Sequence, residues 1–317
     1  MRRFTQVRNS VSTKTTFPTT TLLEKNEHIT EKLLSLIKYE SGRLLLMTGA
    51  GVSTDSGIPD YRGPKGTYTV NKNYKPTYYQ EFAAHHHIRQ RYWARSYFGW
   101  PRMQRVKPNS THFAFAKLQS LGHIQEIITQ NVDALHQAAG SHDILELHGT
   151  LHQVHCMQCG HINSRIDHQK ILSELNPAWA EFLELVEHTK ERPRLNPDGD
   201  VELPSNVSYE TFKYPPCEKC HQGIYKPSLV FFGGNISENV KERSNDMILR
   251  NDSVLIVGST LTTYFAFKLV KLAKELGKNV GIINLGPTKG DDLADYKIEA
   301  HCGKVIPAIA DYLSMGR

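Results

Sequence analysis

Short apolar runs of strand length alternate with helical segments through most of this 317-residue chain. The predicted strands are 44–47, 124–129, 144–147, 253–257 and 280–283. Segments with helical periodicity separate them, at 27–39, 88–97, 113–121, 133–139, 262–276 and 307–313. Strands that alternate with helices form a parallel sheet covered on both faces. The sequence therefore predicts an α/β, Rossmann-like fold.

Four of the predicted strands run into a short polar or glycine motif. These motifs are Gly49-Ala50-Gly51, Gln130-Asn131-Val132-Asp133, Gly258-Ser259-Thr260 and Asn284-Leu285-Gly286. The carboxyl ends of strands in an open α/β sheet form the crevice where ligands bind. Four such motifs together predict a ligand site at that edge of the sheet.

The glycine turn after the first strand is the clearest candidate for a nucleotide site. Gly49 and Gly51 allow a sharp turn and close approach of a ligand, because neither has a Cβ. Ser53 and the residues after it favour a helix start, whose unpaired N–H groups would suit a pyrophosphate. Thr54 stands where a dinucleotide fingerprint has its third glycine. The pattern alone leaves a tight turn without a ligand as an equal alternative.

Four cysteines form two Cys-x-x-Cys pairs, Cys156/Cys159 and Cys217/Cys220. Two such turns together supply four thiolates for one closed, structural zinc site. The interrupting segment, 150–225, is therefore a predicted zinc module, with a redox pair as the alternative. It lacks a basic, aromatic face, and a net charge of +6 is modest, so we expect no nucleic-acid partner.

Other residues are candidates with an ordinary structural alternative. His148 ends a predicted strand beside the crevice and would serve as a general base, although a lone histidine is more often a capped structural one. Asp133 is a candidate ligand or a helix cap. The fifth cysteine, Cys302, is expected to pack near a ligand, and the histidines 85–87 to lie on a solvated surface. Residues 230–234 read as a short buried strand, with an exposed edge for a peptide as the alternative.

The first 23 residues contain no Asp or Glu but several basic and hydroxyl residues. This composition is typical of a mitochondrial transit peptide, with a disordered tail as the alternative for residues 1–26. No apolar run approaches the ~18 to 20 residues that span a bilayer, so no membrane partner is expected.

Taken together, these motifs resemble the sirtuins, the NAD-dependent protein-lysine deacylases. The resemblance covers residues 27–317, in the family's order. Further segments, 58–62, 89–95 and 196–200, look like the class II, mitochondrial sirtuin-four type. The implied catalytic domain has a nucleotide-binding part (27–62, 109–149 and 226–317), a helical module (63–108) and the zinc module (150–225).

The resemblance implies a site for NAD, which is consumed, and for one structural zinc ion. The implied catalytic residues are His148 and Asn131. The implied NAD contacts are Gly49, Ala50, Gly51, Ser53, Asp55, Pro59, Asp60, Tyr61, Arg62, Gln130, Asn131, Asp133, Gly258, Ser259, Thr260, Asn284, Leu285, Gly286 and Cys302. The implied peptide contacts are Val230, Phe231, Phe232, Gly233 and Gly234, opposite residues 261–264.

The chemistry so implied is substitution at the C1′ carbon of the nicotinamide ribose. The carbonyl oxygen of the acyl-lysine displaces nicotinamide and gives an alkylimidate. His148 then activates a ribose hydroxyl, and hydrolysis yields free lysine and O-acyl-ADP-ribose. A dehydrogenase is disfavoured by Thr54 and by the zinc module. Mono-ADP-ribosyl transfer uses the same site and stays open, and a non-catalytic NAD sensor is disfavoured because the polar catalytic candidates are all present.

The acyl group and the cellular setting are also suggested by the resemblance. Tyr92 and Arg95 have the spacing found in sirtuins that remove acidic acyl groups, which predicts longer or carboxylated groups, of lipoyl or glutaryl type, over acetyl. Gly234 departs from the acidic residue common in the family, and the long loop 192–204 is expected to reach the active site. The expected partners are acylated metabolic enzymes of the mitochondrial matrix.

Overall fold

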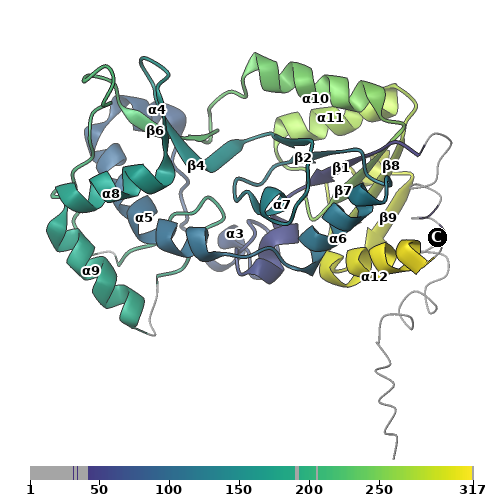
Figure 1. Cartoon of the computed structure of the whole chain (residues 1–317), viewed down its shortest axis with the longest axis horizontal. Coiled ribbons are helices and arrows are strands. Elements are labelled where there is room, and N and C mark those ends of the chain that lie inside the picture. The colour runs from purple at the N-terminus through teal and green to yellow at the C-terminus, as the bar shows by residue number, and fades with distance from the viewer. Residues whose placement is uncertain (1–30, 32–33, 35–41, 190–192, 205, 316–317) are drawn as a thin grey trace, which may run out of the picture.

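The computed structural model describes residues 31, 34, 42–189, 193–204 and 206–315. Among these residues, the larger part of the molecule is built on a six-stranded parallel sheet. Its order is β3-β2-β1-β7-β8-β9 (Figure 1). The strands are β1 (Leu44–Thr48), β2 (Glu126–Thr129), β3 (Ile144–Glu146), β7 (Ser253–Val257), β8 (Asn279–Asn284) and β9 (Tyr296–Glu299). The predicted parallel sheet is confirmed, and β9 is an edge strand that sequence reasoning missed.

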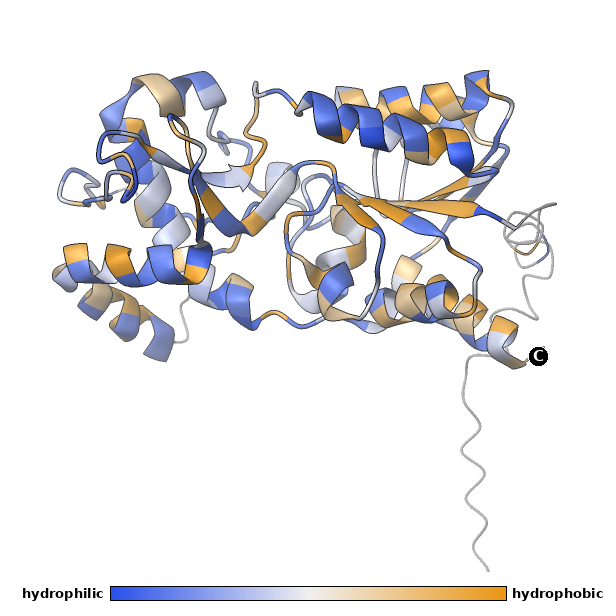
Figure 2. Cartoon of the chain, turned by 45° about the horizontal axis from the view of Figure 1, so that its top comes forward, coloured by the Kyte–Doolittle hydropathy of each residue, from blue (hydrophilic) through white to orange (hydrophobic). Residues whose placement is uncertain are grey.

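The central strand β1 has every residue buried because helices cover both faces of the sheet. Leu44 and Leu46 pack in one apolar cluster with α6 (Ser110–Ser120) and α12 (Cys302–Met315). Leu45 and Met47 point the other way, into a cluster with α10 (Glu238–Arg250) and α11 (Tyr264–Glu275). The two pairs face opposite sides because side chains alternate along a strand. Figure 2 shows these strands as an apolar layer between helices.

The smaller part is built on an antiparallel sheet of order β5-β4-β6 among the described residues. Its strands are β4 (Gly149–Cys156), β5 (Ile162–Ser164) and β6 (Tyr225–Leu229). Helices α4 (Tyr79–Ala84), α5 (His86–Arg105), α8 (Arg165–Leu175) and α9 (Pro177–His188) lie in this part of the molecule, with the short α3 (Thr67–Val70) between it and the larger part (Figure 1). Rings from α5 and from the segment after α9 fill its core.

Several predicted boundaries were wrong. The strand expected at 230–234 does not form, because β6 ends at Leu229 and a turn follows, with Gly233 at φ +72° and a bond from Gly234 N–H to Phe231 O. The first strand leads into a 3-10 helix, η1 (Ala50–Ser56), and not into a helix starting at Ser53. The last helix begins at Cys302, before Pro307. Most of the predicted helix 27–39 and all of the tail 1–26 lie outside the described residues.

The short helix predicted at 133–139 forms as α7 (Leu135–Ala138), and a 3-10 turn, η2 (Asp291–Leu293), precedes β9. Sequence reasoning missed α10, whose polar residues outnumber its apolar ones. None of the helices in the described part of the chain is long and apolar enough to cross a bilayer.

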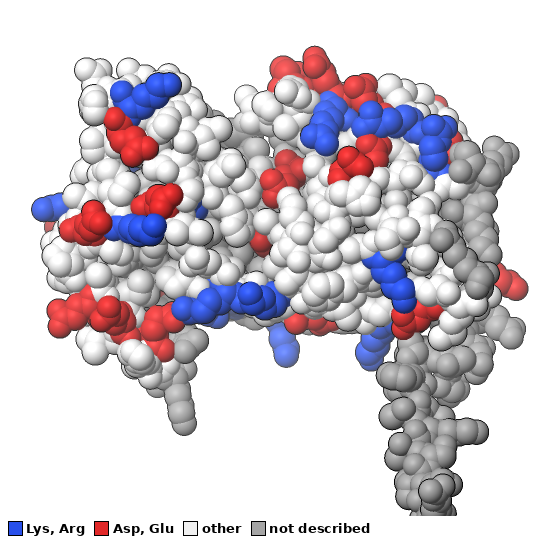
Figure 3. All heavy atoms as spheres, viewed as in Figure 1, with Lys and Arg blue, Asp and Glu red and all other residues white. Residues whose placement is uncertain are grey.

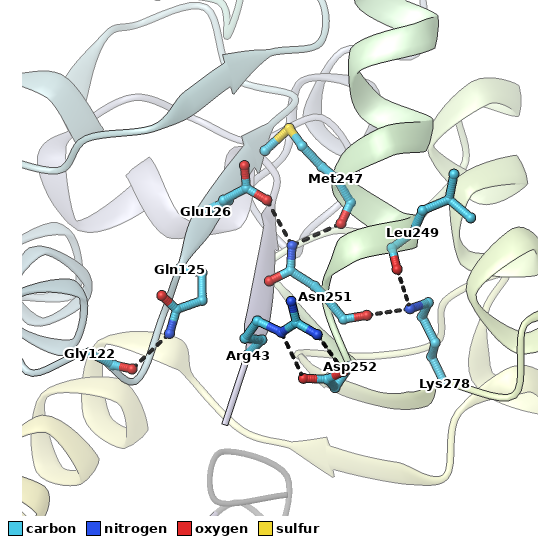
Figure 4. A network of polar contacts seen from close by, with 9 residues as sticks. All are labelled: Arg43, Gly122, Gln125, Glu126, Met247, Leu249, Asn251, Asp252 and Lys278. Carbon is cyan, nitrogen blue, oxygen red and sulfur yellow. Dashed lines mark hydrogen bonds and ion pairs between the residues drawn. The ribbon is translucent and has the colours of Figure 1, made fainter. Parts of the chain in front are cut away.

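Polar side chains tie together the amino ends of three strands of the larger sheet (Figure 4). The Asn251 amide, at the end of α10, donates to Glu126 of β2 and to the Met247 carbonyl, at 2.8 Å each. Asn251 is buried, whereas the neighbouring ion pair of Arg43 with Asp252 is largely open to water. This edge is closed by the protein's own bonds, which leaves the opposite, carboxyl edge for a ligand.

We predict that Asn251→Ala lowers the free energy of unfolding by about 1–3 kcal/mol, because it removes the side-chain donor to the buried Met247 carbonyl and leaves Glu126 with its bonds from Arg250 alone. Arg43→Ala is the matched control and should change it by less than ~1 kcal/mol, as exposed ion pairs contribute little. Urea unfolding of both variants measures the difference. Equal losses would show that the buried amide has no special role.

Candidate active site

The four strand-end motifs meet in one cavity of about 1480 Å³ at the carboxyl edge of the larger sheet. Further walls come from the loop between η1 and α3, from residues 229–236 and from residues 197–198. Most of the predicted NAD contacts line it, namely Gly49, Ala50, Gly51, Ser53, Asp60, Tyr61, Arg62, Gln130, Asn131, Asp133, Gly258, Ser259, Thr260, Asn284, Leu285, Gly286 and Cys302. Asp55 and Pro59 do not line it. The four motifs thus share one cavity, as the sequence predicted.

The glycine turn packs closely against the loop that follows β7. Gly51 N–H donates to Gly258 O at 2.9 Å, and Gly49 N–H donates to Val257 O at 3.1 Å. A Cβ on Gly51 would lie 2.9 Å from the Gly258 backbone. The expectation of unpaired N–H groups is therefore wrong at these two glycines. They are needed because two loops pack backbone against backbone.

The Ser53 hydroxyl links the Asp133 carboxylate to the Asn131 amide in the 130–133 motif. Its hydroxyl donates to Asp133 Oδ2 at 2.7 Å, and the Asn131 amide donates to the Ser53 hydroxyl and to Gly49 O, both at 3.1 Å. Asp133 Oδ1 accepts from Leu135 N–H at 3.0 Å, so the aspartate also starts α7. Gln130 donates to the Ser259 hydroxyl at 2.8 Å. These bonds fix polar groups on the cavity wall before a ligand arrives.

His148 has a defined tautomer. Its Nδ1 lies 3.0 Å from the Gln130 carbonyl, which can only accept, so Nδ1 carries the proton and Nε2 keeps its lone pair. Burial lowers the pKa of His148 below its ordinary value of 6.5, although the Gln130 carbonyl acts in the other direction. The imidazole is consequently neutral near pH 7 and able to accept a proton within the cavity.

Cys302 is not a nucleophile in this setting. Its Sγ lies 3.6 Å from Gly51 O, and burial raises the pKa of the thiol to about 11. A protonated thiol is a poor nucleophile. The expected packing role near the ligand agrees with this position.

The segment 230–234 forms the wall next to His148. Val230 N–H donates to His148 O at 2.8 Å, and Phe232 O accepts from Tyr79 N–H at 2.9 Å. Phe231 is buried, while Phe232 is partly exposed between the rings of Tyr78 and Tyr61. An aromatic rim therefore surrounds the cavity on the side of the smaller part.

Tyr92 and Arg95 do not line the cavity, contrary to their predicted place in an acyl pocket. Arg95 Nη2 forms an ion pair with Asp200 Oδ2 at 2.9 Å, and Arg95 Nε donates to Val201 O at 2.8 Å; both charged side chains are buried. Tyr92 packs against Phe231, one layer behind the wall. The physical reason is that the 192–204 loop supplies its own carboxylate to the arginine.

The same loop reaches the cavity, as its length suggested. Pro197 and Asp198 line the wall, and Gly199 O packs so tightly on α5 that a Cβ at Gly99 would lie 2.0 Å from it. Burial and the neighbouring Asp200 raise the pKa of Asp198 to about 8. A carboxyl that is largely protonated near neutrality thus stands beside the ligand space.

The four cysteines of the two pairs converge at one end of the smaller sheet. Their Sγ atoms all lie within 4.8 Å of one another. Backbone N–H groups of Gln158 and Gly223 point at Cys156 and Cys220 sulfurs, at 3.4 and 3.3 Å. Four thiols without any other ligand suit a structural zinc ion and leave no open position for catalysis. The histidines 85–87 are exposed, as predicted.

Some cavity residues carried no signal in the sequence. Examples are Ile236, Lys241, Lys268, Lys289 and His301. They come from the segment before α10, from α10 and α11, and from the loops around β8 and β9, so only the fold shows that they share a wall.

Comparison with known proteins gives one family throughout. The model of the Sir2 family matches residues 49–264. The NAD-dependent protein deacylase SIR4 of Batrachochytrium dendrobatidis is 46% identical, over 88% of this chain and 92% of that protein. The mitochondrial NAD-dependent protein lipoamidase sirtuin-4 of Bos taurus is 39% identical, over 85% and 82%. A solved Sir2 structure with a p53 peptide and NAD+ has a TM-score of 0.65 at 26% identity, covering 90% of this chain and 99% of its own.

We predict one zinc ion per chain, lost in Cys217→Ala, because three thiolates cannot close the tetrahedral site. Metal analysis after gel filtration measures the ratio, and thermal unfolding should show a lower midpoint for the variant. Cys302→Ala removes a cysteine outside the cluster and should keep its zinc. Zinc retained at one ion per chain by Cys217→Ala would contradict the assignment.

Proposed function

The chain belongs to the Sir2 family and is an NAD-dependent protein deacylase, and on that premise we propose that the cavity at the carboxyl edge of its larger sheet holds both NAD and the acylated lysine. The acyl group passes to ADP-ribose and nicotinamide is released. The carrying observation is that His148 stands, with its free Nε2, where the strand-end motifs meet segment 230–234.

The NAD half of the cavity consists of the strand-end motifs and residues 60–62. The Asn131 side-chain NH2 donates to Gly49 O and to the Ser53 hydroxyl. Its side-chain carbonyl oxygen is therefore left to accept from a ribose hydroxyl. Asp133 keeps further acceptor capacity for the carboxamide of nicotinamide. Asp55 and Pro59 are left out of this proposal because they do not line the cavity.

The reaction needs one proton acceptor, and His148 is placed to be it. The acyl carbonyl oxygen bonds to C1′ as the bond from C1′ to nicotinamide breaks. Nε2 of His148 then takes the proton of a ribose hydroxyl, whose oxygen attacks the acyl carbon. Water completes the release of the lysine. Nδ1 stays bonded to Gln130 O and stabilises the imidazolium that forms.

Pro197 and Asp198 line the same cavity, and we propose that the acyl chain extends towards them, which favours chains longer than acetyl, of lipoyl type. A distal carboxylate, as in a glutaryl group, can pair with Arg95 only when the ion pair between Arg95 and Asp200 is broken. The buried pair therefore sets how well carboxylated chains are accepted.

We also propose that residues 27–317 act as one catalytic unit with the three parts given above. The mitochondrial matrix, with acylated metabolic enzymes as substrates, is the proposed location. Two observations support it: the composition of the first 23 residues, and the mitochondrial designation of the bovine relative.

His148→Tyr should lower acyl-peptide-dependent release of nicotinamide and of free lysine by ~10²–10⁴-fold, the usual contribution of a general base. In the native enzyme, the acidic limb of the kcat profile should lie below pH 6.5, because the lowered pKa keeps the imidazole neutral to lower pH. His142→Asn, an exposed histidine, is the control and should keep its activity. Full activity in His148→Tyr would contradict the role.

Asp200→Asn should raise the kcat/KM ratio of a glutaryl-lysine peptide to a neutral acyl-lysine peptide of equal length. Freeing a buried arginine for a charged hydrogen bond predicts roughly tenfold. Glu202→Gln, which alters a carboxylate of the same loop bonded to Asn71, is the matched control. An unchanged ratio, or a rise that persists in the double variant with Arg95→Leu, would remove Arg95 from acyl recognition.

A further inference from the structure

Three lysines from three separate elements line the active-site cavity: Lys241 of α10, Lys268 of α11 and Lys289 of the loop after β8. The NAD half of the proposed function uses none of them. On the face shown in Figure 3, basic and acidic side chains lie side by side over the region of α10 and α11. The question is which chemistry this arrangement fits.

Two of the lysines lie beside residues 262–264. Lys289 Nζ lies 3.4 Å from Thr262 O. Lys268 stands four residues after Tyr264, hence on the same face of α11. Tyr264 is 80% exposed and lines the cavity. This wall thus carries an open aromatic ring with two ammonium groups near it.

Lys241 belongs to the opposite wall. Segment 230–236 leads into α10, and Gly234, Asn235 and Ile236 line the cavity along with Lys241. Lysines accordingly flank both segments between which the family resemblance implies that the substrate backbone lies. Neither segment 230–236 nor segment 258–264 contains a charged residue of its own.

Nearby carboxylates neutralise little of the positive charge of these three lysines. Lys268 and Lys289 have no ion pair with any described residue, and Lys241 pairs with Glu238, an exposed carboxylate that contributes little. Asp60 and Asp133, on the wall of the NAD half, are engaged by Gly63 N–H and by the Ser53 hydroxyl. Glu299 lines the cavity with His301 and Cys302, by the last strand. A substrate with carboxylates near these lysines could therefore form ion pairs with their ammonium groups.

We propose that Lys241, Lys268 and Lys289 form a specificity rim that selects acylated lysines flanked by acidic residues. This rests on the proposed function, because it assumes that the peptide lies between segments 230–234 and 261–264. The acyl group is read inside the cavity, and the sequence around the lysine is read at its mouth.

The test compares three peptides with one acyl-lysine and with Glu, Gln or Lys at the two residues on each side. The native enzyme should show a KM lowest for Glu and highest for Lys, by roughly two- to fivefold per lysine engaged, as for partly exposed ion pairs. About 0.5 M salt should remove most of the difference, because screening weakens exposed pairs. The kcat should stay nearly constant.

Lys268→Glu should reverse the order of the Glu and Lys peptides. Lys271→Glu makes the same charge change on an exposed residue of α11 that does not line the cavity, and it should keep the native order. Equal KM values for the three peptides on the native enzyme, or a Lys268→Glu effect confined to the KM for NAD, would overturn the rim. No deacylation of any peptide would instead refute the proposed function itself.

Discussion

Close backbone contact between two loops is the constraint on which the active site depends. Gly51 donates to Gly258 O at 2.9 Å, and a Cβ on Gly258 would lie 2.7 Å from Val52 N. The loops follow β1 and β7, which are neighbours in the parallel sheet. Only residues without a Cβ allow this contact, which draws the strand-end motifs into one cavity wall. Those glycines serve the protein's own packing and, through it, the ligand.

Much of this arrangement could be predicted from local sequence. Periodicity gave β1 and β7, and the rule that strand carboxyl ends share an edge placed Gln130 and Gly258 in one site. Cysteine spacing gave the metal cluster. What failed depended on contacts between distant segments: no local pattern shows that Asp200 occupies Arg95, or that a turn at Gly233 ends the expected strand. The lysines of the rim likewise share a wall only through the fold.

The two parts of the molecule contribute different walls to the active-site cavity. The larger sheet and its loops hold the groups proposed to bind NAD, while the smaller part, with its cysteine cluster, presents Pro197 and Asp198 to the same cavity. The loop bearing them is fixed on α5 by the buried pair of Arg95 with Asp200 and by the contact at Gly99. Family membership therefore accounts for the reaction, whereas long-range packing of this loop shapes the part of the cavity that we propose for the acyl chain.

Mass spectrometry of both products is the most direct test of this account. The enzyme is incubated with NAD and a lipoyl-lysine peptide, and the peptide and nucleotide masses are followed together. Transfer to ADP-ribose predicts a peptide lighter by the acyl group, an equal amount of acyl-ADP-ribose and one nicotinamide per lysine freed. An intact acyl-lysine with ADP-ribose attached to protein, or acyl loss without nicotinamide, would contradict it.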